Sequence, residues 1–379
     1  MQILHAGLSW FYWGRLEPDC LDRPGRAQIA GGETAMLRAA FETAARGHDV
    51  HVVTWSYPGR HRGVRFHDKH DFYDVVIDGG PWDAVVVWGE PTVLAELTHA
   101  GALDGALRIC AMQCNGFAHR DALRGYVDVY VSPSQHHADM LRDVFEIPAE
   151  KFWVIPNAVH PARYRFDKPR DPFAVYHASS PDRGLHHLLE AWPEIRITEP
   201  RATLDVYYEV EKFLKYPFNH PLMDDLVLRI KAAIAGVRRG RGVTFRGAQP
   251  QQVVADRATT AGVMAYPCDP VVYTEGYGTA VLEAYCAGAE VVCSDADAFG
   301  EVYGAGGIGL DLMPKKKIRE ELVPRVLAAL ERAREQRPNS ECEPALRARL
   351  EAYSWAQVGK RWCALLEKAR APKMAEAAA

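Results

Sequence analysis

Short, continuously apolar runs alternate with segments of helical periodicity from one end of this 379-residue chain to the other. The runs occupy residues 3–6, 50–54, 84–88, 108–112 and 127–132 in the first half, and residues 173–177, 203–208, 243–245, 263–266 and 290–294 in the second. A strand that is apolar on both faces is typical of a parallel sheet covered by helices on both sides. The alternation therefore predicts a doubly wound α/β architecture.

A proline-rich span divides the chain, which is long enough for two domains of ordinary size. Four prolines fall between residues 156 and 172 and mark a linker. We expect an α/β domain of the Rossmann type over residues 1–160 and a second over residues 161–353, facing each other across a cleft. Ligands of such sheets bind at the carboxyl ends of the strands. Helical periodicity between the apolar runs covers residues 33–46, 91–99, 134–145, 184–192, 221–235, 251–258 and 279–287.

The last helix carries a heavy apolar stripe. It begins at Ser354, and Gln357 three residues later completes the pattern of a capping box. The stripe that follows at helical spacing consists of Trp355, Val358, Trp362, Leu365 and Leu366. Such a stripe must pack on a large surface, so we expect residues 354–370 to cross back from the second domain and join the first.

Composition excludes several classes of protein. The net charge of −4 and the pI near 6.4 give no overall attraction to nucleic acid or to an acidic membrane. No stretch approaches the roughly 20 apolar residues that span a bilayer, and the N-terminus lacks the layout of a signal peptide, so we expect a cytoplasmic protein. None of the eight cysteines forms a CxxC pair, which favours buried thiols over disulfides or a zinc site.

The segment from Tyr266 to Gly288 carries the most chemical information. A strand ends at Tyr266, a loop follows, and a helix begins near Gly278, whose N-terminal amides can bind an anion. Gly276 and Gly278 let the backbone approach a ligand closely. Glu275 and Glu283 lie eight positions apart, slightly over two helical turns, so both can face one site. Because a carboxylate can accept hydrogen bonds from two neighbouring sugar hydroxyls, the segment fits a phosphate flanked by two polyols, which describes a nucleotide sugar.

These residues resemble the E-x7-E motif of retaining GT-B glycosyltransferases, broadly the family-four group. The flanking sequences from Glu275 and from Leu282 look like that family's EGFG and LEAMAxG. Four further blocks follow the family's order, namely Gly31-Gly32-Glu33, Val131–Ser134 with Val154–Val159, Ser179–Leu185, and Val243–Gly247. One E-x7-E arises often by chance, but ordered blocks in the right strand, loop and helix contexts do not.

The resemblance implies a role for each matching residue. Glu275 would bind hydroxyls of the donor sugar, and the backbone of Gly276, Tyr277, Gly278 and Thr279 would meet the sugar and the distal phosphate. Glu283 would hold the ribose. Arg183 would bind phosphate where the family has a lysine, and Gly31 and Gly32 would contact the phosphates from the other domain. The resemblance also implies front-face transfer with retention, with no metal or other cofactor and with a nucleoside-diphosphate sugar as substrate.

Two departures from the family leave alternatives open. Only Arg183 is cationic in its block, so a second cation such as Arg246 would have to come from elsewhere. Many members have a histidine near position 113, where this chain has Gln113; either Asn115 or His119 is then the candidate for contact with the donor sugar. The family's usual proline before its last strand is here Glu290, which the sequence does not explain.

Simpler interpretations compete with these roles. Glu275 alone could be a helix N-cap, Glu283 a solvated helix residue and Arg183 a surface cation. Asp295 and Asp297 form a DxD string, which we interpret as turn and cap residues rather than a metal site.

The sequence constrains the acceptor site less than the donor site. Trp10, Tyr12 and Trp13 follow the first strand and offer a stacking platform for a sugar or a base. Arg60, Arg62 and Arg65 belong to a basic run that is either a solvated loop or a site for an anionic acceptor. Hydroxymethylated DNA is a minority acceptor hypothesis, which the acidic pI opposes. The competing functions are a sugar-nucleotide epimerase or phosphorylase, and a non-catalytic sugar-nucleotide-binding protein of the same fold.

Overall fold

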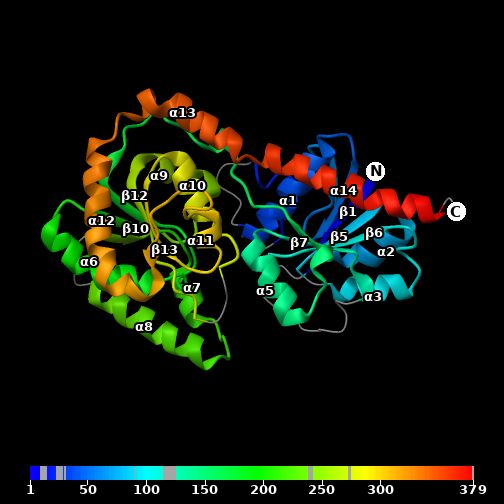
Figure 1. Cartoon of the computed structure of the whole chain (residues 1–379), viewed down its shortest axis with the longest axis horizontal. Coiled ribbons are helices and arrows are strands. Elements are labelled where there is room, and N and C mark those ends of the chain that lie inside the picture. The colour runs from blue at the N-terminus through cyan, green and yellow to red at the C-terminus, as the bar shows by residue number, and fades with distance from the viewer. Residues whose placement is uncertain are drawn as a thin grey trace. The chain divides into compact units, whose positions relative to one another are not determined.

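The computed structural model describes residues 1–8, 15–22, 29, 31–89, 91–113, 125–237, 242–271 and 275–377. The chain divides into two compact units (Figure 1). The N-terminal unit comprises Met1–Ala158 together with Ser354–Ala379, and the C-terminal unit comprises Val159–Tyr353. Each unit is an α/β sandwich built on one sheet.

The sheet of the N-terminal unit has the strand order β3-β4-β2-β1-β5-β6-β7-β8. Neighbouring strands are parallel except for β3 and β4, which form a hairpin. The chain leaves the central strand β1 towards β2 and later returns on the other side to β5, so the order reverses between β1 and β5. The strands are β1 (Gln2–Gly7), β2 (Asp49–Thr54), β3 (Gly59–His61), β4 (Val64–Asp68), β5 (Ala84–Trp88), β6 (Leu107–Ala111), β7 (Val129–Ser132) and β8 (Phe152–Val154).

Helices cover both faces of this sheet because its strands are apolar on both sides. One face packs against α1 (Gly31–Ala44) and α14 (Trp355–Ala377), and the other against α2 (Phe72–Asp78), α3 (Thr92–His99) and α5 (Gln135–Phe145). The predicted apolar stripe of the last helix is confirmed, since all five of its residues are buried in the core with α1. The ring centroid of Trp362 lies 5.7 Å from that of Trp88 on β5.

The predicted capping box at the start of α14 is wrong. The buried Ser354 hydroxyl has no hydrogen-bond partner among the described residues. The Gln357 side chain turns along the helix instead, where its Oε1 accepts a hydrogen bond from Lys360 Nζ at 3.0 Å. Burial of Trp355 and Val358 at this end, rather than side-chain capping, therefore holds the first turn.

The sheet of the C-terminal unit has the order β11-β10-β9-β12-β13-β14, with every neighbouring pair parallel. Its order reverses between β9 and β12, which pair directly. The strands are β9 (Asp171–His177), β10 (Thr203–Val206), β11 (Val243–Phe245), β12 (Ala261–Tyr266), β13 (Glu290–Asp295) and β14 (Met313–Pro314).

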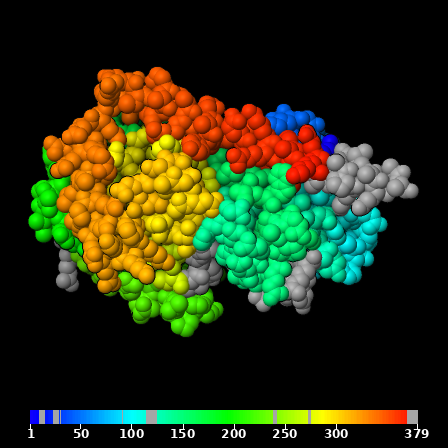
Figure 2. Space-filling view, viewed as in Figure 1, coloured from blue at the N-terminus to red at the C-terminus, as the bar shows by residue number. Residues whose placement is uncertain are grey.

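Two sets of helices enclose this second sheet. One face packs against α6 (Leu185–Thr198), α8 (Pro221–Val237) and α12 (Ile318–Glu335), and the other against α9 (Gln251–Thr260), α10 (Thr279–Ala287) and α13 (Asn339–Ala352). The short helices α7 (Val210–Lys215) and α11 (Phe299–Val302) follow the carboxyl ends of β10 and β13. Figure 2 shows the orange surface of α12 and α13 bordering the yellow surface of the preceding chain.

Each of the ten predicted strands is present with bounds shifted by at most two residues at either end. The basic run that contains Arg60, Arg62 and Arg65 includes the hairpin β3–β4, where Arg60 pairs with Arg65 across the two strands. Edge strands bury only one side, so they lack the continuous apolar run that marks the central strands.

The 3-10 helices are η1 (Lys69–Asp71), η2 (Ala149–Lys151), η3 (Pro161–Arg163) and η4 (Lys315–Lys317). Among the described residues no helix is both long and apolar enough to cross a membrane.

Candidate functional site

The two loops at the reversal point of the C-terminal sheet carry the main sequence motifs. One loop joins β9 to α6 and contains Arg183, and the other joins β12 to α10 and contains Glu275. The loops touch, because an added Cβ at Gly184 would lie 1.8 Å from the Pro267 carbonyl oxygen. Gly184 also has a φ of +86°, which side chains rarely adopt. In sheets of this kind the reversal point is where ligands bind.

Arg183 and Glu275 form an ion pair at this point. Arg183 Nε lies 2.9 Å from Glu275 Oε2, and Arg183 Nη1 lies 3.2 Å from Asp182 Oδ2. The Tyr266 hydroxyl, at the end of β12, donates to the same Glu275 Oε2 at 2.9 Å. Tyr266 in turn shares a hydrogen bond of 2.9 Å with the Ser179 hydroxyl. Arg183 is only 17% exposed, so it is not the surface cation of the simpler interpretation.

The backbone at Glu275 is held from a third loop. Asp297, after β13, accepts a hydrogen bond from the Glu275 amide at 2.8 Å. Asp297 has a φ of +51° in a turn, which agrees with the predicted turn role, and it also positions the candidate sugar-binding residue. The N-cap of α10 is Gly278, so the N-cap interpretation of Glu275 is wrong.

Gly278 is required at that cap. Its φ is +73°, and an added Cβ would lie 2.3 Å from the Phe299 ring. The Tyr303 hydroxyl donates to the Gly278 carbonyl at 2.8 Å, which fixes the entry into α10. The Tyr277 side chain is buried and packs edge-to-face on Tyr303, so this residue can offer a ligand its backbone rather than its ring. Gly276 and Thr279 are half-buried on either side.

Glu283 lies in the middle of α10 in a different environment from Glu275. It is half-buried, and burial raises the pKa of its carboxyl group while the charge of Arg163 partly offsets the rise. Burial and the Glu283 charge also raise the pKa of the buried tyrosines Tyr164 and Tyr176. Glu283 is therefore not the solvated residue of the simpler interpretation. Sequence reasoning missed Arg163, Tyr164 and Tyr176, because their approach to α10 is set by tertiary packing.

The titration behaviour of the site favours charge stabilisation over acid–base chemistry. Burial opposes the charged form of Arg183, but Glu275 and Asp182 outweigh it and raise the Arg183 pKa, so the cation persists at all ordinary pH values. Burial, with Glu275, raises the pKa of Tyr266 and of the Cys268 thiol well above their usual ranges. Burial lowers the pKa of His177 to about 4, and its ring stacks on Tyr266. Cys268 and His177 are thus neutral near pH 7.

Several predicted site residues belong to the N-terminal unit or are not described. Trp10, Tyr12, Trp13, Asn115 and His119 lie outside the described residues. Gly31 and Gly32 begin α1, and no described residue lies within 4 Å of the place where a Cβ on Gly31 would stand. Their phosphate contact stays a prediction.

Two of the three arginines of the predicted acceptor cluster pair with carboxylates of their own unit. Arg62 Nε lies 2.6 Å from Asp22 Oδ2, and Arg65 Nη2 lies 3.4 Å from Asp49 Oδ2. Arg60 is exposed on β3. Asp49 begins β2, so Arg65 lies near the amino end of the sheet, opposite to the edge where parallel sheets bind ligands.

The carboxyl edge of the same sheet holds a cation that the sequence did not single out. Arg15 forms an ion pair with Asp68 at the end of β4, and its Nε donates to the Ser56 carbonyl at 3.1 Å. Its guanidinium lies 4.3 Å from the ring centroid of Tyr57, which is 44% exposed. No sequence motif marks Arg15, because the pairing joins residues far apart in the chain.

A second cation for phosphate has two candidates in the C-terminal unit. Arg246, at the end of β11, donates from Nε to Asp205 Oδ1 at 2.8 Å and is half exposed. Lys315 Nζ lies 3.6 Å from Asp269 Oδ1 in the β12–α10 loop, and His187 Nε2 contacts Asp269 Oδ2 at 3.0 Å. Within the described ranges, no group of three or more His, Cys, Asp or Glu side chains is placed to hold a metal ion.

Comparison with known proteins agrees with this geometry. Residues 172–332, within the C-terminal unit, match the family model of the glycosyl transferases group 1. No curated protein matches the chain.

Solved structures of glycosyltransferases are similar over nearly the whole chain. Sucrose-phosphate synthase from Thermosynechococcus elongatus superposes with a TM-score of 0.69 at 14% identity, covering 98% of this chain and 100% of that one. HepE of Anabaena, solved with UDP and glucose, gives 0.66 at 17% identity over 97% and 100%. An α,α-trehalose-phosphate synthase from Burkholderia xenovorans gives 0.59 at 12% identity over 97% and 99%. The fold is therefore GT-B, and together with the family match it supports a glycosyltransferase.

Proposed function

We propose that this protein is a retaining glycosyltransferase that moves a sugar from a nucleoside-diphosphate sugar to an acceptor hydroxyl, without a metal or other cofactor. The observation that carries the proposal is the Arg183–Glu275 ion pair at the reversal point of the C-terminal sheet. A cation and a carboxylate side by side match the two polar parts that such a donor brings together, a diphosphate and a ring of hydroxyl groups. The UDP and glucose bound in HepE are the corresponding parts of a donor in a protein of the same fold.

Glu275 is the residue we assign to the donor sugar. The two contacts to its carboxylate, from Arg183 Nε and the Tyr266 hydroxyl, both use Oε2. No hydrogen bond or ion pair among the described residues uses Oε1, which is then the oxygen able to accept hydrogen bonds from a ligand. Since the Asp297 side chain holds the backbone amide, the carboxylate is positioned before the donor arrives, which lowers the entropy cost of binding.

Arg183 is the residue we assign to the leaving diphosphate. In the reaction, the bond between the anomeric carbon and the phosphate oxygen breaks, and the acceptor oxygen bonds to the same face of that carbon. The acceptor proton passes to the leaving phosphate oxygen. Negative charge grows on the diphosphate as the bond breaks, and a fixed cation stabilises that charge. The neutral His177 and Cys268 take no part as acid or nucleophile.

Glu283 is the residue we assign to the ribose of the donor. Gly276, Gly278 and the first turn of α10 lie between the two glutamates in the chain, and backbone amides at the start of a helix suit the distal phosphate. Arg163 limits the cost of keeping the Glu283 carboxylate ionised in a half-buried position. One helix thus presents backbone amides for the phosphate at its start. At its middle it presents a carboxylate that accepts hydrogen bonds from ribose hydroxyl groups.

The acceptor is not assigned. The N-terminal unit is the place we propose for it, with Gly31 and Gly32 contacting the phosphates from that side. Hydroxymethylated DNA gains no support from the fold or from the family match. A cytoplasmic location remains part of the proposal.

A non-catalytic nucleotide-sugar-binding protein is the second candidate, and one observation favours it. Arg183 lies between two carboxylates, and the other cations near this edge, Arg246 and Lys315, are each held by an aspartate. Phosphate stabilisation is then weaker than with a free pair of cations. Donor binding without turnover or hydrolysis is the result that would select this candidate.

Calorimetric titration with UDP-, GDP-, ADP- and TDP-sugars tests the proposal. We expect one donor to bind wild type tightly and to bind Glu283→Ala more weakly by about 1.5–3 kcal/mol, the value of a hydrogen bond to a charged group. Glu343→Ala is the matched control, since Glu343 lies on α13 in a half-exposed pair with Arg347. Absence of binding by all four donors would refute the proposal. With an acceptor in hand, the anomeric configuration of the product, read by proton NMR, decides whether transfer is retaining.

A further inference from the structure

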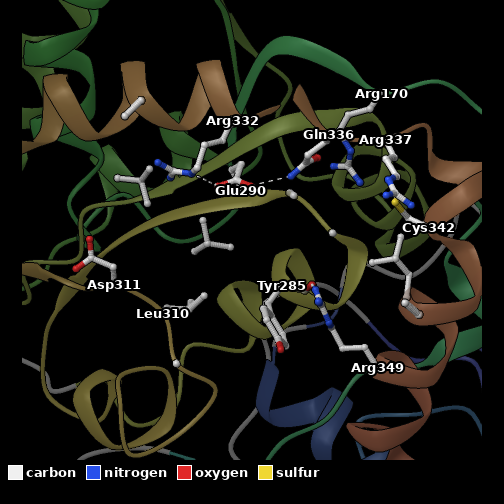
Figure 3. A pocket seen from close by; sticks show the side chains of 18 of the residues that line it. Arg170, Tyr285, Glu290, Leu310, Asp311, Arg332, Gln336, Arg337, Cys342 and Arg349 are labelled. Atoms are coloured by element: carbon white, nitrogen blue, oxygen red, sulfur yellow. Dashed lines mark hydrogen bonds and ion pairs between the residues drawn. The ribbon is translucent and has the colours of Figure 1, made fainter. Parts of the chain in front are cut away.

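A cavity opens at the end of the C-terminal sheet that lies opposite to the donor loops. Its volume is about 780 Å³, and it is lined by the start of β13, the end of α10, the segment before β14, α12 from Pro324 onwards and α13 (Figure 3). The donor loops follow the carboxyl ends of β9 and β12, whereas this cavity lies at the amino end, where β13 begins at Glu290. A volume of roughly 300–1,000 Å³ is typical of pockets for small molecules.

Arginine dominates the lining of this cavity. Two carboxylates, Glu290 and Asp311, face five arginines: Arg170, Arg325, Arg332, Arg337 and Arg349. Both carboxylates are already paired, Glu290 Oε2 with Arg332 Nε at 2.7 Å and Asp311 Oδ2 with Arg325 Nη1 at 2.8 Å. Figure 3 shows Glu290 between Arg332 and Gln336, whose side-chain amide donates to Oε1 at 2.8 Å. The lining therefore carries three more arginines than carboxylates.

The other three arginines have no carboxylate partner among the described residues. Arg170 is structural, because its guanidinium donates to the carbonyl oxygens of Ala261 and Ala287 at 2.5 and 2.8 Å. Arg349 donates to the Tyr285 carbonyl at 2.6 Å and stacks over the Tyr285 ring at 4.1 Å. Arg337 is exposed, and no described residue gives its guanidinium a hydrogen bond or an ion pair. Arg337 and Arg349 thus leave uncompensated positive charge at the cavity.

We propose that this cavity is a binding site for a phosphorylated small molecule, separate from the donor site. The phosphate lies beside the guanidinium groups of Arg337 and Arg349, the arginines whose charge is uncompensated, because the planar fork of arginine matches the geometry of a phosphate. The Tyr285 ring and the Arg349 guanidinium stacked on it form one wall for the rest of the molecule. A sugar phosphate and a nucleotide share this chemistry and differ in whether a base uses that wall.

The site also accounts for Glu290, whose identity the sequence left unexplained. Its carboxylate holds Arg332 and Gln336 in place at the cavity rim. None of the residues assigned to the donor site lines the cavity. The proposal is consequently independent of the proposed transferase activity, although α10 carries both Glu283 and Tyr285.

Calorimetry with ribose 5-phosphate and AMP, at low salt and without nucleotide sugar, tests this proposal. We expect wild type to bind at least one of them and not to bind ribose. Arg337→Glu should lower the affinity about tenfold or more, because it removes a charged hydrogen bond and introduces repulsion. Arg361→Glu is the matched control, since Arg361 is an exposed helix arginine on the N-terminal unit, and it should leave the affinity unchanged. Circular dichroism establishes that both variants are folded.

The variants also locate the bound molecule. Tighter binding of AMP than of ribose 5-phosphate identifies a nucleotide site, and equal affinities identify a sugar-phosphate site. Binding that Arg183→Ala abolishes but Arg337→Glu leaves intact would place the molecule in the donor site and overturn the proposal. Absence of binding by both phosphates would overturn it as well. Failure of the donor titration leaves these results unaffected, so the two proposals fail separately.

Discussion

The two units share a strand topology but differ in what their loops bring to the reversal point. In each sheet the chain starts at a central strand, proceeds to one side and returns to the other, at β1 and β5 in one unit and at β9 and β12 in the other. In the C-terminal unit the loops at this point place Arg183 and Glu275 2.9 Å apart. At the carboxyl edge of the N-terminal sheet, Arg15 and Asp68 form a pair that also ties down Ser56. The topology supplies an edge in both units, and the loop residues decide its chemistry.

The glycines of the two units show the same difference. Gly184 and Gly278 have positive φ and no space for a side chain, because a carbonyl oxygen and an aromatic ring occupy the place of a Cβ. For Gly31, in the other predicted phosphate-binding segment, no described residue lies within 4 Å of the place of a Cβ. The C-terminal loops are therefore built to a fixed shape, whereas the described part of the N-terminal loop tolerates change.

The largest predicted effect is on kcat, and it should distinguish the Arg183–Glu275 pair from the Arg15–Asp68 pair. Arg183→Ala should lower kcat by about 10²–10³, the scale for loss of one charge-stabilising donor. Arg15→Ala should leave kcat within about twofold and cost roughly 0–1 kcal/mol of stability, as expected for a partly exposed ion pair. The measurements are donor turnover and urea denaturation of each variant. Near-normal turnover in Arg183→Ala removes Arg183 from the mechanism, and a large fall in Arg15→Ala would give the N-terminal edge a chemical role.

The next largest predicted effect is on stability, and it should distinguish Gly184 from Gly31. Gly184→Ala should destabilise the protein by about 3 kcal/mol or more, through backbone strain at positive φ together with a clash against the Pro267 carbonyl. Gly31→Ala should be neutral or stabilising by about 0.5–1 kcal/mol, since alanine favours a helix over glycine. Urea denaturation measures both changes. Equal stability of the two variants would contradict the fixed shape that we assign to the β9–α6 loop.

Sequence reasoning located the central strands and the donor motif because both depend on local pattern. A strand buried on two faces is continuously apolar, and the Glu275–Glu283 segment shows its strand, loop and helix within 25 residues. The α10 bounds, Thr279–Ala287, agree with the prediction. The edge strands β3, β8 and β14, and β4 next to β3, were not predicted because these short strands lack a continuous apolar run.

The contacts that assemble the site were beyond local pattern. Tyr266 was recognised as the end of a strand, but its hydrogen bond to Glu275 depends on how the loop returns. The sequence predicts a turn at Asp297, but the hydrogen bond that Asp297 accepts from the Glu275 amide joins loops after two different strands. Arg163 lies near Glu283 because η3 packs against α9 and α13, the two helices that flank α10. Such pairings are set by tertiary structure, and a single sequence carries no record of them.

The smallest predicted effect concerns the pH dependence of stability. It should have opposite signs for Glu283 in the C-terminal unit and Asp68 in the N-terminal unit. Burial raises the pKa of Glu283, so its contribution to stability is present at acid pH and is lost as the pH rises through the folded-state pKa. The contribution of Asp68 to stability depends on pH in the opposite direction. A hydrogen bond from the His70 amide, and then Arg15, lower its pKa, so its contribution is present at neutral pH and is lost as the pH falls through the folded-state pKa.

At pH 7 the amide variants should therefore change stability in opposite directions. Glu283→Gln removes a charge that burial disfavours and should raise the free energy of unfolding, while it weakens donor binding. Asp68→Asn loses its ion pair and should lower that free energy by roughly 1 kcal/mol. Urea denaturation at pH 7 and at pH 4 measures both, and each difference from wild type should shrink at the lower pH. Destabilisation by Glu283→Gln at pH 7 would mean that the Glu283 carboxylate is retained for the fold. A gain in stability together with a loss of donor affinity would mean that the Glu283 carboxylate is retained to bind the ligand. That result would agree with a donor site in the C-terminal unit.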